Sequence, residues 1–391
     1  MANKTNISIN GKNYFRIQKV VGHKLNKNGF EIPVKKTFYG KTKKEAEQKY
    51  KEYMQKKALN LDGSKQYFGV MAERWLYEFL VNDNNLKPGT KDLYISTWNK
   101  YIKPLELYHS ALEEVSAGTI QAIYNRLYKS GVPASAVKTI NKVMSRLYNY
   151  FVQQGYSPFN FTNTLSLPKE KIEESKKIIT WSDEELHTIL NSFSKAQKGF
   201  RLRLLIVLAS YTGMRISELL GLKYSDIEQT ENGYIINVRR QVNNIAEYSP
   251  DGSKTNTLGV CELKSASSYR SIPIPELVVK EINAHKRKHL KEQMLKGYRT
   301  EFIFTTDSGG FVDNRNSRTA CERYYKRIGV PTHGFHTYRH TFGTNLYKQG
   351  VPLKTASDLM GHKDINITAR YYVGIGEEEK RKAIEILVKA M

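Results

Sequence analysis

A charged segment near the middle of the chain most constrains how this sequence can fold. Seven of the nine residues from Lys169 to Lys177 are charged, and the segment follows Pro158 and Pro168. Because it lacks the apolar periodicity of a helix or a strand, it cannot contribute a face to a core. We therefore expect an exposed linker over residues 161–178, with separately folded domains on either side. A chain of 391 residues is long enough for two or three domains.

The region before this linker, residues 66–160, shows the apolar spacing of helices. Apolar residues recur three or four positions apart in four stretches, which are Tyr67–Val81, Pro88–Ile102, Ala117–Lys129 and Ser135–Gln154. This spacing places the apolar side chains on one face of each helix, where they can pack together. We expect a compact helical bundle.

The first 60 residues hold nearly half of the excess positive charge. They contain 15 Lys and Arg residues and four Glu residues but no Asp, which is a net +11 of the chain's +24. Such a concentration points to a polyanionic partner of its own. We expect residues 1–60 to form a basic DNA-binding domain, and the alternative is a solvated basic tail.

Two short strands and one helix are predicted within this basic region. Residues Tyr14–Val21 and Phe30–Val34 are rich in β-branched and aromatic residues, and a turn-rich stretch separates them. Thr42 and Glu45 form a capping-box pair, which predicts a helix over Lys43–Lys57. A small sheet of this kind can enter the major groove of DNA.

Residues 179–391 are expected to form a mainly helical domain with a small antiparallel sheet. Ser182 and Glu185 form a second capping box, and Phe200–Tyr211 is a strongly apolar helix. Strand-like segments follow at Tyr234–Val238, Val260–Leu263 and Tyr269–Ile274, and helices are predicted from there onward. The predicted fold class of the whole chain is α+β.

The segment Glu377–Met391 is predicted to be an amphipathic helix. Its apolar residues on one face are Ala383, Ile384, Leu387 and Val388. This face could dock onto its own domain or onto a neighbouring protomer, and the sequence does not choose between the two.

The overall charge and the two cysteines limit the class of protein. With 62 Lys and Arg residues against 38 Asp and Glu residues, self-repulsion favours a polyanion as the normal partner, and nucleic acid fits best. A run of about 18 apolar residues, which a membrane span needs, does not occur, so we expect an intracellular protein without a membrane partner. Cys261 and Cys321 form no CxxC pair, so neither a disulfide framework nor a zinc knuckle is expected.

Four segments of residues 179–391 each offer a cation or an imidazole, and the last one ends in two tyrosines. They are Thr212-Gly213-Met214-Arg215, Leu263-Lys264-Ser265, His336-Thr337-Tyr338-Arg339-His340 and Gly361-His362 with Tyr371-Tyr372 nine and ten residues later. Arg215 opens a helix, where free N–H groups already favour an anion. Lys264 is predicted near the tip of a β-hairpin.

These residue types together suit chemistry on a phosphodiester. Arg215 and Arg339 could clamp the two non-bridging oxygens and stabilise the transition state, because a guanidinium fork matches phosphate and stays charged. A tyrosine nucleophile needs a proton acceptor, and His336 suits that role. Lys264 can protonate the leaving 5′-oxygen. We expect His362 to be an additional hydrogen-bond donor to the phosphate.

Two other interpretations compete with this one. His336 and His340, with His333 and His362, could be zinc ligands, but Arg339 between the first two would repel a cation, and we expect no metal. His340 is then a packed, hydrogen-bonded histidine. The segment from Leu353 to Tyr372 also has the pattern of a helix-turn-helix, so a non-catalytic DNA-binding regulator is the alternative function.

The order Arg, Lys, His-x-x-Arg-His, Gly-His and Tyr resembles that of tyrosine recombinases of the phage and conjugative-transposon integrase type. The resemblance covers roughly residues 180–391. It implies site-specific DNA integration or excision of a mobile element through a 3′-phosphotyrosyl intermediate without cofactors. It further implies core-type DNA bound by residues 66–160, arm-type DNA bound by residues 1–60, and a homotetramer on paired sites. Excisionase and DNA-bending proteins are possible partners, and a bacterial cytoplasm is the expected location.

The same resemblance favours Tyr372 as the nucleophile. In the family pattern an apolar residue follows three positions after the tyrosine, and Ile375 satisfies this for Tyr372, whereas Gly374 follows Tyr371. Gly374 itself departs from the pattern, since family members often carry His there. Tyr371 therefore remains the alternative, and on a helix only one of the two neighbours can face the phosphate.

Overall fold

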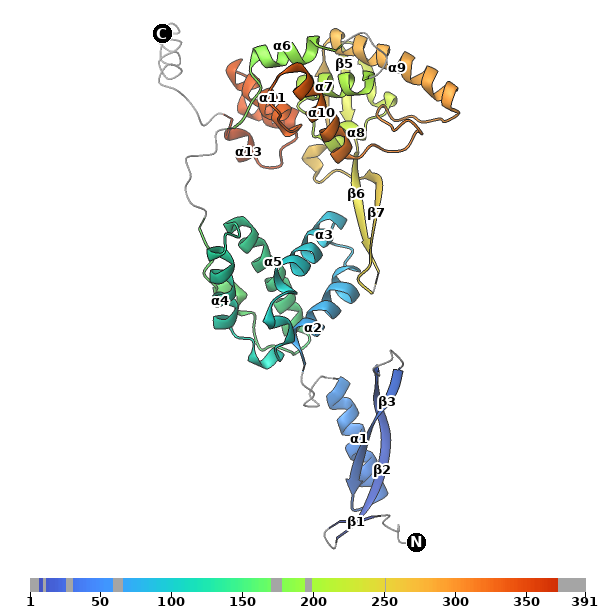
Figure 1. Ribbon diagram of the computed structural model, residues 1–391, viewed down its shortest axis with the longest axis vertical. Coiled ribbons are helices and arrows are strands. Elements are labelled where there is room, and N and C mark those ends of the chain that lie inside the picture. Colours follow the sequence, from blue (N-terminus) through green and yellow to red (C-terminus); the bar gives the residue numbers. More distant parts are fainter. Residues whose placement is uncertain are drawn as a thin grey trace. The chain divides into compact units, whose positions relative to one another are not determined.

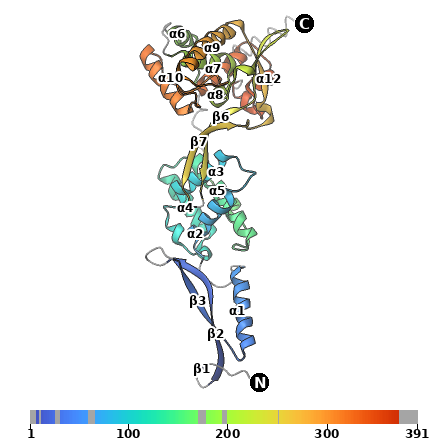
Figure 2. The same ribbon diagram turned by 90° about the vertical axis from the view of Figure 1, so that its right-hand side faces the viewer.

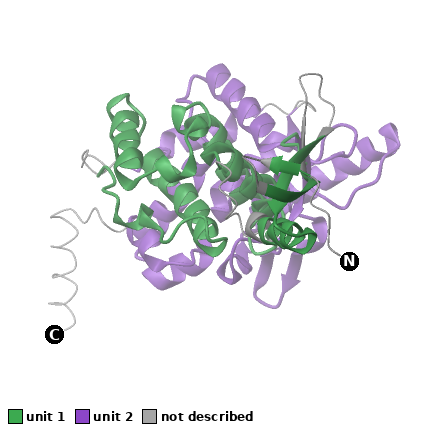
Figure 3. Cartoon of the chain, turned by 90° about the horizontal axis from the view of Figure 1, so that it is seen from below, with its two compact units in different colours: residues 1–172, 248–253 green, residues 173–247, 254–391 purple. Residues whose placement is uncertain are grey.

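The computed structural model divides the chain into two compact units (Figure 3). The first consists of residues 1–172 with 248–253, and the second of residues 173–247 with 254–391. The residues that the structure describes are 7–9, 12–25, 31–58, 66–169, 178–193, 199–249 and 251–371. Most of the charged segment 169–177 and all of Glu377–Met391 lie outside these ranges, and the three-domain division stays a prediction.

The N-terminal part is an antiparallel sheet backed by one helix (Figure 2). The strands β1 (Ile7–Ile9), β2 (Lys12–Leu25) and β3 (Glu31–Gly40) lie in the order β1-β2-β3, and helix α1 (Lys43–Ala58) packs on β2 and β3. Thr42 accepts from the N–H of Glu45, as predicted. The third strand is longer than Phe30–Val34, because pairing with β2 continues as far as Gly40.

The two faces of this sheet differ because side chains alternate along each strand. Phe38 is buried and its ring lies 5.5 Å from the rings of Tyr50 and Tyr53 on α1. The next residue, Tyr39, belongs to the opposite face and pairs with Arg16 across the strands. The sheet therefore has one face against α1 and one open face.

Residues 66–169 form a helical core (Figure 1). Its elements are α2 (Phe68–Arg74), η1 (Trp75–Leu80), α3 (Pro88–Thr97), η2 (Trp98–Ile102), η3 (Glu106–His109), η4 (Leu112–Glu114), α4 (Ala117–Lys129), α5 (Ala134–Gln153) and η5 (Phe161–Thr164). The four predicted helical stretches are present. In the first two, however, the helix widens into a π-helical turn at Trp75 and at Trp98, both of which are buried.

Aromatic side chains fill the centre of this helical core. Phe68, Trp98, Tyr148 and Phe151 are each buried and contact one another through their rings. Phe161 also packs on Tyr148, so the core continues past residue 160.

The second unit combines helices with a small sheet, which confirms the predicted α+β class (Figure 1). Its elements are α6 (Asp183–Asn191), α7 (Phe200–Thr212), α8 (Ile216–Leu220), η6 (Tyr224–Asp226), β4 (Ile227–Thr230), β5 (Gly233–Val238), β6 (Gln241–Tyr248), β7 (Lys254–Cys261), η7 (Ala266–Ser268), β8 (Arg270–Ile274), α9 (Glu276–Lys296), α10 (Asn314–Ile328), α11 (His336–Lys348), α12 (Leu353–Met360) and α13 (Ile365–Ala369). The apolar helix α7 packs against α9 and α11. Its side chains from Leu204 to Ala209 are all buried.

The prediction that Lys264 sits at the tip of a hairpin is wrong. Strand β7 pairs with β6, whereas β8 pairs with β5 in the sheet β4-β5-β8. Lys264 therefore lies in the connection between two different sheets. The prediction failed because β6 carries no strong alternation that would have marked it as the partner of β7.

Among the described residues, no helix is both long and apolar enough to cross a membrane.

Candidate active site

Arg339 anchors the site from within the core of the second unit. It lies in the first turn of α11 and is only 1% exposed. Its Nη1 donates to the carbonyl oxygen of Gly213 at 2.9 Å, and its Nη2 donates to the carbonyl oxygen of Met360. These bonds tie α11 to the C-terminal ends of α7 and α12. Burial and the nearby charge of Arg215 lower the pKa of Arg339 to about 9, so it is still cationic at neutral pH.

The turn between α7 and α8 depends on a glycine. Gly213 ends α7 with φ 58°, a left-handed conformation that side chains with a Cβ rarely adopt. A Cβ at this position would also lie 2.4 Å from the ring of Phe342. The sharp turn directs the Gly213 carbonyl to Arg339 and starts the next helix at Arg215.

Arg215 is held by a buried glutamate. Nη1 of Arg215 lies 2.7 Å from Oε1 of Glu218, and the backbone N–H of Arg215 donates to Oε2 of the same carboxylate at 3.0 Å. Glu218 is 2% exposed, while the Arg215 side chain is 31% exposed and so remains accessible. Burial alone would raise the pKa of Glu218, but the charges of Arg270 and Arg215 lower it below its usual value. The carboxylate therefore stays ionised and orients Arg215.

His336 begins α11 and is exposed. Desolvation of its ring and the positive charges of its neighbours, Arg339 and Arg215 among them, lower the pKa of His336 to about 4. Its ring centroid lies 4.5 Å from that of His340, one helical turn further on. In the free protein His336 is neutral at pH 7, which is the form that can accept a proton.

His362 follows the turn that ends α12. Gly361 has φ 65°, and His362 itself is 8% exposed with its Nδ1 2.7 Å from the hydroxyl of Thr368. Burial lowers the pKa of His362 to about 3, and the charges of Arg339, Arg215, Arg270 and His336 add to this effect. The hydrogen bond through Nδ1 fixes the ring and leaves Nε2 for another partner.

The structure thus brings together five of the predicted residues, among them Tyr371, the alternative nucleophile. Arg215, His336, Arg339, His362 and Tyr371 are close enough for the charges of the two arginines to shift the pKa values of the two histidines and of the tyrosine. Lys264 is exposed in the bend that precedes η7. The sequence did not single out Arg270, but its charge also lowers the pKa values of Arg339 and His362.

Tyr371 is the last residue of the chain that the structure describes. The Tyr371 ring is 9% exposed, and its hydroxyl lies 2.8 Å from Nδ1 of His340. Burial raises the pKa of Tyr371, although the charges of Arg339, Arg215 and Arg370 oppose this. His340 is the packed, hydrogen-bonded residue that we expected. Tyr372 lies outside the described residues.

The described residues contain no group of three or more His, Cys, Asp or Glu side chains arranged to hold a metal ion. Cys321 is buried, which raises the pKa of its thiol to about 12, and Cys261 is partly buried.

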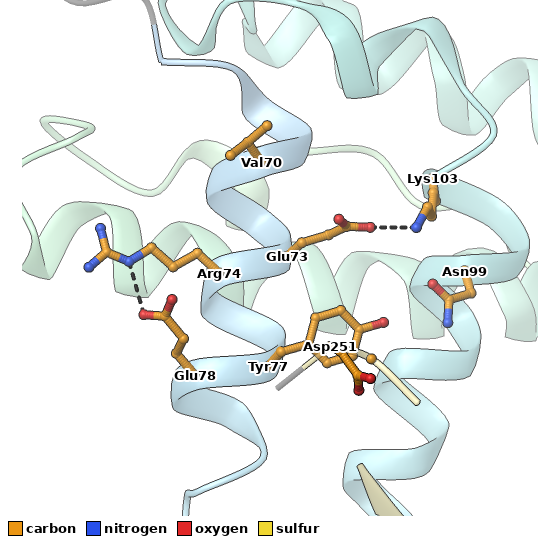
Figure 4. A pocket seen from close by; sticks show the side chains of 9 residues that line it. Val70, Glu73, Arg74, Tyr77, Glu78, Asn99, Lys103 and Asp251 are labelled. Carbon is orange, nitrogen blue, oxygen red and sulfur yellow. Dashed lines mark hydrogen bonds and ion pairs between the residues drawn. The ribbon is translucent and has the colours of Figure 1, made fainter. Parts of the chain in front are cut away.

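A separate hollow of about 590 Å³ lies in the first unit (Figure 4). Its walls carry two ion pairs, between Glu73 and Lys103 at 2.7 Å and between Arg74 and Glu78 at 3.0 Å. Asp251, from residues 248–253 of this unit, also lines it. None of the predicted site residues takes part in this hollow.

Comparison with known proteins gives the class of this molecule. The sequence pattern of the Phage integrase family matches residues 180–377, which is just over half of the chain. A protein of Caldanaerobacter subterraneus subsp. tengcongensis, described as tyrosine recombinase XerC-like, is 35% identical over 99% of this chain and 99% of its own length. The integrase of Staphylococcus phage L54a is 26% identical over 82% of this chain and 92% of its own length.

Solved structures share the fold. The Tn1549 transposon integrase, in complex with transposon right end DNA, covers 81% of this chain and 99% of its own, with a TM-score of 0.60 and 20% identity. The XerH site-specific recombinase, bound to its palindromic difH substrate, covers 82% of this chain and 95% of its own, with a TM-score of 0.56 and 17% identity.

The chain belongs to the phage integrase family. Its activity is that of a tyrosine-type site-specific DNA recombinase.

Proposed function

We propose that this recombinase cuts and rejoins duplex DNA through a 3′-phosphotyrosyl bond to Tyr372, with the site residues Arg215, Lys264, His336, Arg339 and His362. The observation that carries the proposal is the meeting of two guanidiniums and two neutral imidazoles at one place in the second unit. A neutral base beside fixed cations is the combination that attack on a phosphodiester by a tyrosine requires.

Cleavage would begin with direct attack of Tyr372 on the phosphodiester. The Tyr372 oxygen attacks phosphorus, and its proton passes to His336. The bond between phosphorus and the 5′-oxygen breaks, and Lys264 gives a proton to that oxygen. Arg215, Arg339 and His362 donate to the non-bridging oxygens, whose charge grows in the transition state. Rejoining is the reverse step with a different 5′-hydroxyl, so no nucleotide cofactor is needed.

The fixed guanidiniums favour the transition state because little has to rearrange when it forms. Glu218 holds Arg215 at 2.7 Å, and two backbone carbonyls hold Arg339. Arg339 uses two of its five N–H donors for these carbonyls, so it has donors left for phosphate. Preorganised donors of this kind are each worth about a hundredfold or more in rate.

The remaining parts of the chain are assigned to DNA binding and assembly. Residues 1–60 would bind arm-type DNA, residues 66–160 core-type DNA, and residues 179–391 would form the catalytic domain. The segment 161–178 would join the last two, although Phe161 at its start packs in the helical core. A homotetramer on paired sites would exchange one pair of strands at a time and so integrate or excise a mobile element. Excisionase and DNA-bending proteins would set the direction.

A nicked duplex tests this function directly. The full chain is incubated with a duplex carrying the ends of its element and a nick just beyond the cleavage position, so that the short 5′-hydroxyl product diffuses away and the covalent adduct accumulates. The adduct should form in excess chelator, because Arg215 and Arg339 supply the positive charge. DNA bound without any adduct would instead support the non-catalytic regulator.

A further inference from the structure

We infer that Arg270 is a positioning residue for the recombination chemistry, because its one guanidinium ties its own segment, which carries Lys264, to α8 and to α12. The inference rests on the proposed function and adds a residue that neither the Arg, Lys, His and Tyr pattern nor the proposed cleavage step contains. Arg270 opens β8 and its side chain is 6% exposed.

Two nitrogens of Arg270 bond other elements, and the third bonds the turn just before Arg270. Nη2 donates to Oε2 of Glu218 at 2.9 Å, Nε donates to the carbonyl oxygen of Leu359 at 2.8 Å, and Nη1 donates to the carbonyl oxygen of Ser268 at 3.0 Å. Glu218 is the carboxylate that orients Arg215. Leu359 lies in the last turn of α12, three residues before His362. Ser268 closes the η7 turn that follows Lys264.

The packing around Gly361 shows how close two of these segments are. A Cβ at Gly361 would lie 3.0 Å from both Cδ and Nη1 of Arg270 and 3.1 Å from the carbonyl oxygen of Ser267. The turn that presents His362 therefore rests directly on Arg270 and on the connection that carries Lys264. A movement of Arg270 would displace both.

Electrostatics make this arrangement sensitive to the loss of Arg270. Glu218 is 2% exposed and is shared by Arg215 and Arg270. Without Arg270 the carboxylate would pair with Arg215 alone, and the stronger hold on Arg215 would draw its guanidinium from the phosphate. A buried charge that loses one partner of a network is also destabilised.

Lysine cannot replace this guanidinium. Three acceptors in three directions match the planar fork of arginine, whereas an ammonium is a single point at the end of a flexible chain. Arg270→Lys therefore keeps the charge near Glu218 and loses the bonds to Leu359 and Ser268. Misplacement of catalytic groups by about 1 Å costs on the order of a hundredfold in rate, and we expect a loss of this size in the cleavage rate.

The experiment measures single-turnover cleavage by the full chain on the nicked duplex, together with DNA affinity. A second substrate carries sulfur in place of the bridging 5′-oxygen, because a thiolate leaves without a proton from Lys264. We expect Arg270→Lys to bind DNA as the native chain does and to cleave the oxygen substrate about a hundredfold more slowly. On the sulfur substrate the deficit should shrink, since the displaced Lys264 is no longer needed, but it should not vanish, since His362 is displaced too.

Arg240→Lys is the matched control. Arg240 also bonds a buried carboxylate through both terminal nitrogens, that of Asp226, and its side chain donates to the carbonyl oxygen of Gly221. Neither partner is a predicted site residue. The Arg240→Lys protein should lose about as much free energy of unfolding as Arg270→Lys. Its cleavage rate should stay within about twofold of the native rate. If Arg270→Lys cleaves like Arg240→Lys, or if sulfur relieves none of its deficit, Arg270 does not position the site. A native chain that forms no adduct would overturn the proposed function itself, so the two failures are distinguishable.

Discussion

The phenolic oxygen of Tyr371 lies 2.8 Å from Nδ1 of His340, and this bond joins the segment after α13 to the middle of α11. The ring is buried, and its edge lies close to Gly343, where a Cβ would be 3.3 Å from Cδ2 of Tyr371. These contacts hold the ring in place, and the charges of Arg339 and Arg215 also act on its hydroxyl.

With Tyr372 as the nucleophile, Tyr371→Phe should retain covalent cleavage. The change removes the hydroxyl and keeps the ring, so it costs the hydrogen bond to His340, about 1 kcal/mol of stability. We expect an adduct yield within a few-fold of native and a small fall in the free energy of unfolding, measured by urea titration. A Tyr371→Phe protein that is folded, binds DNA and forms no adduct would show that Tyr371 is the nucleophile.

Arg215→Lys should bind DNA and cleave it poorly. The ammonium keeps the ion pair with Glu218 but cannot donate two parallel bonds to a phosphate. We expect the single-turnover cleavage rate to fall by about a hundredfold or more, with little change in the dissociation constant for DNA. Arg203→Lys is a suitable control, since Arg203 pairs with Glu281 away from the site. Equal rates for the two variants would remove Arg215 from the chemistry.

Stability should fall as the pH drops below about 6.5, because buried histidines must then take up protons. Burial lowers the pKa of His285 to about 3, and the charges of His289, Arg201 and Lys288 contribute to the shift. The folded pKa is below the unfolded value, so stability is complete above pH 6.5 and is lost towards pH 3. Between pH 7 and pH 5 this one group should cost about 2 kcal/mol.

His285→Leu removes this titration and should reduce the loss of stability between pH 7 and pH 5 by a similar amount. The measurement is hydrogen exchange of α9 (Glu276–Lys296) during urea unfolding, which reports on the second unit alone. The pKa of His362 is lowered as well, so its protonation also destabilises the folded chain as the pH falls. Part of the loss of stability should therefore remain in both proteins. The same loss in native and variant chains would contradict the account of His285.

The open face of the N-terminal sheet should read a separate DNA sequence. Arg16 pairs with Tyr39 across this face, Val20 pairs with Lys35, and all four side chains are exposed. Arg16→Ala with Lys35→Ala should weaken binding to arm-type DNA. The slope of log affinity against log salt should become shallower by about 0.9 for each phosphate that the variant no longer neutralises. Cleavage of the nicked core duplex should not change.

Lys44→Ala with Lys51→Ala provides a control with the same change in charge, since both residues are exposed on α1 rather than on the sheet. Equal effects of the two pairs, on specific and scrambled DNA alike, would mean that the N-terminal region attracts DNA only through its charge.

The sequence predicted the site residues that can be identified from a pattern within one short segment. Arg215 was marked by the Thr-Gly break before it, and His336 and Arg339 by their spacing on one helix. Arg270 was not identified, because its role depends on Glu218, 52 residues away in sequence, and on a carbonyl of α12, 89 residues away. Strand β6 and the π-helical turns at Trp75 and Trp98 were missed for the same reason, since tertiary packing and pairing decide them.

The most direct test of the account is to identify the residue that carries DNA in the covalent adduct. The adduct formed on the nicked duplex is digested with protease and nuclease, and the modified peptide is sequenced by mass spectrometry. We predict a nucleotide on Tyr372, and no adduct from Tyr372→Phe although this variant still binds DNA. A nucleotide on Tyr371 or on any other residue, or an adduct from Tyr372→Phe at the native yield, would contradict it.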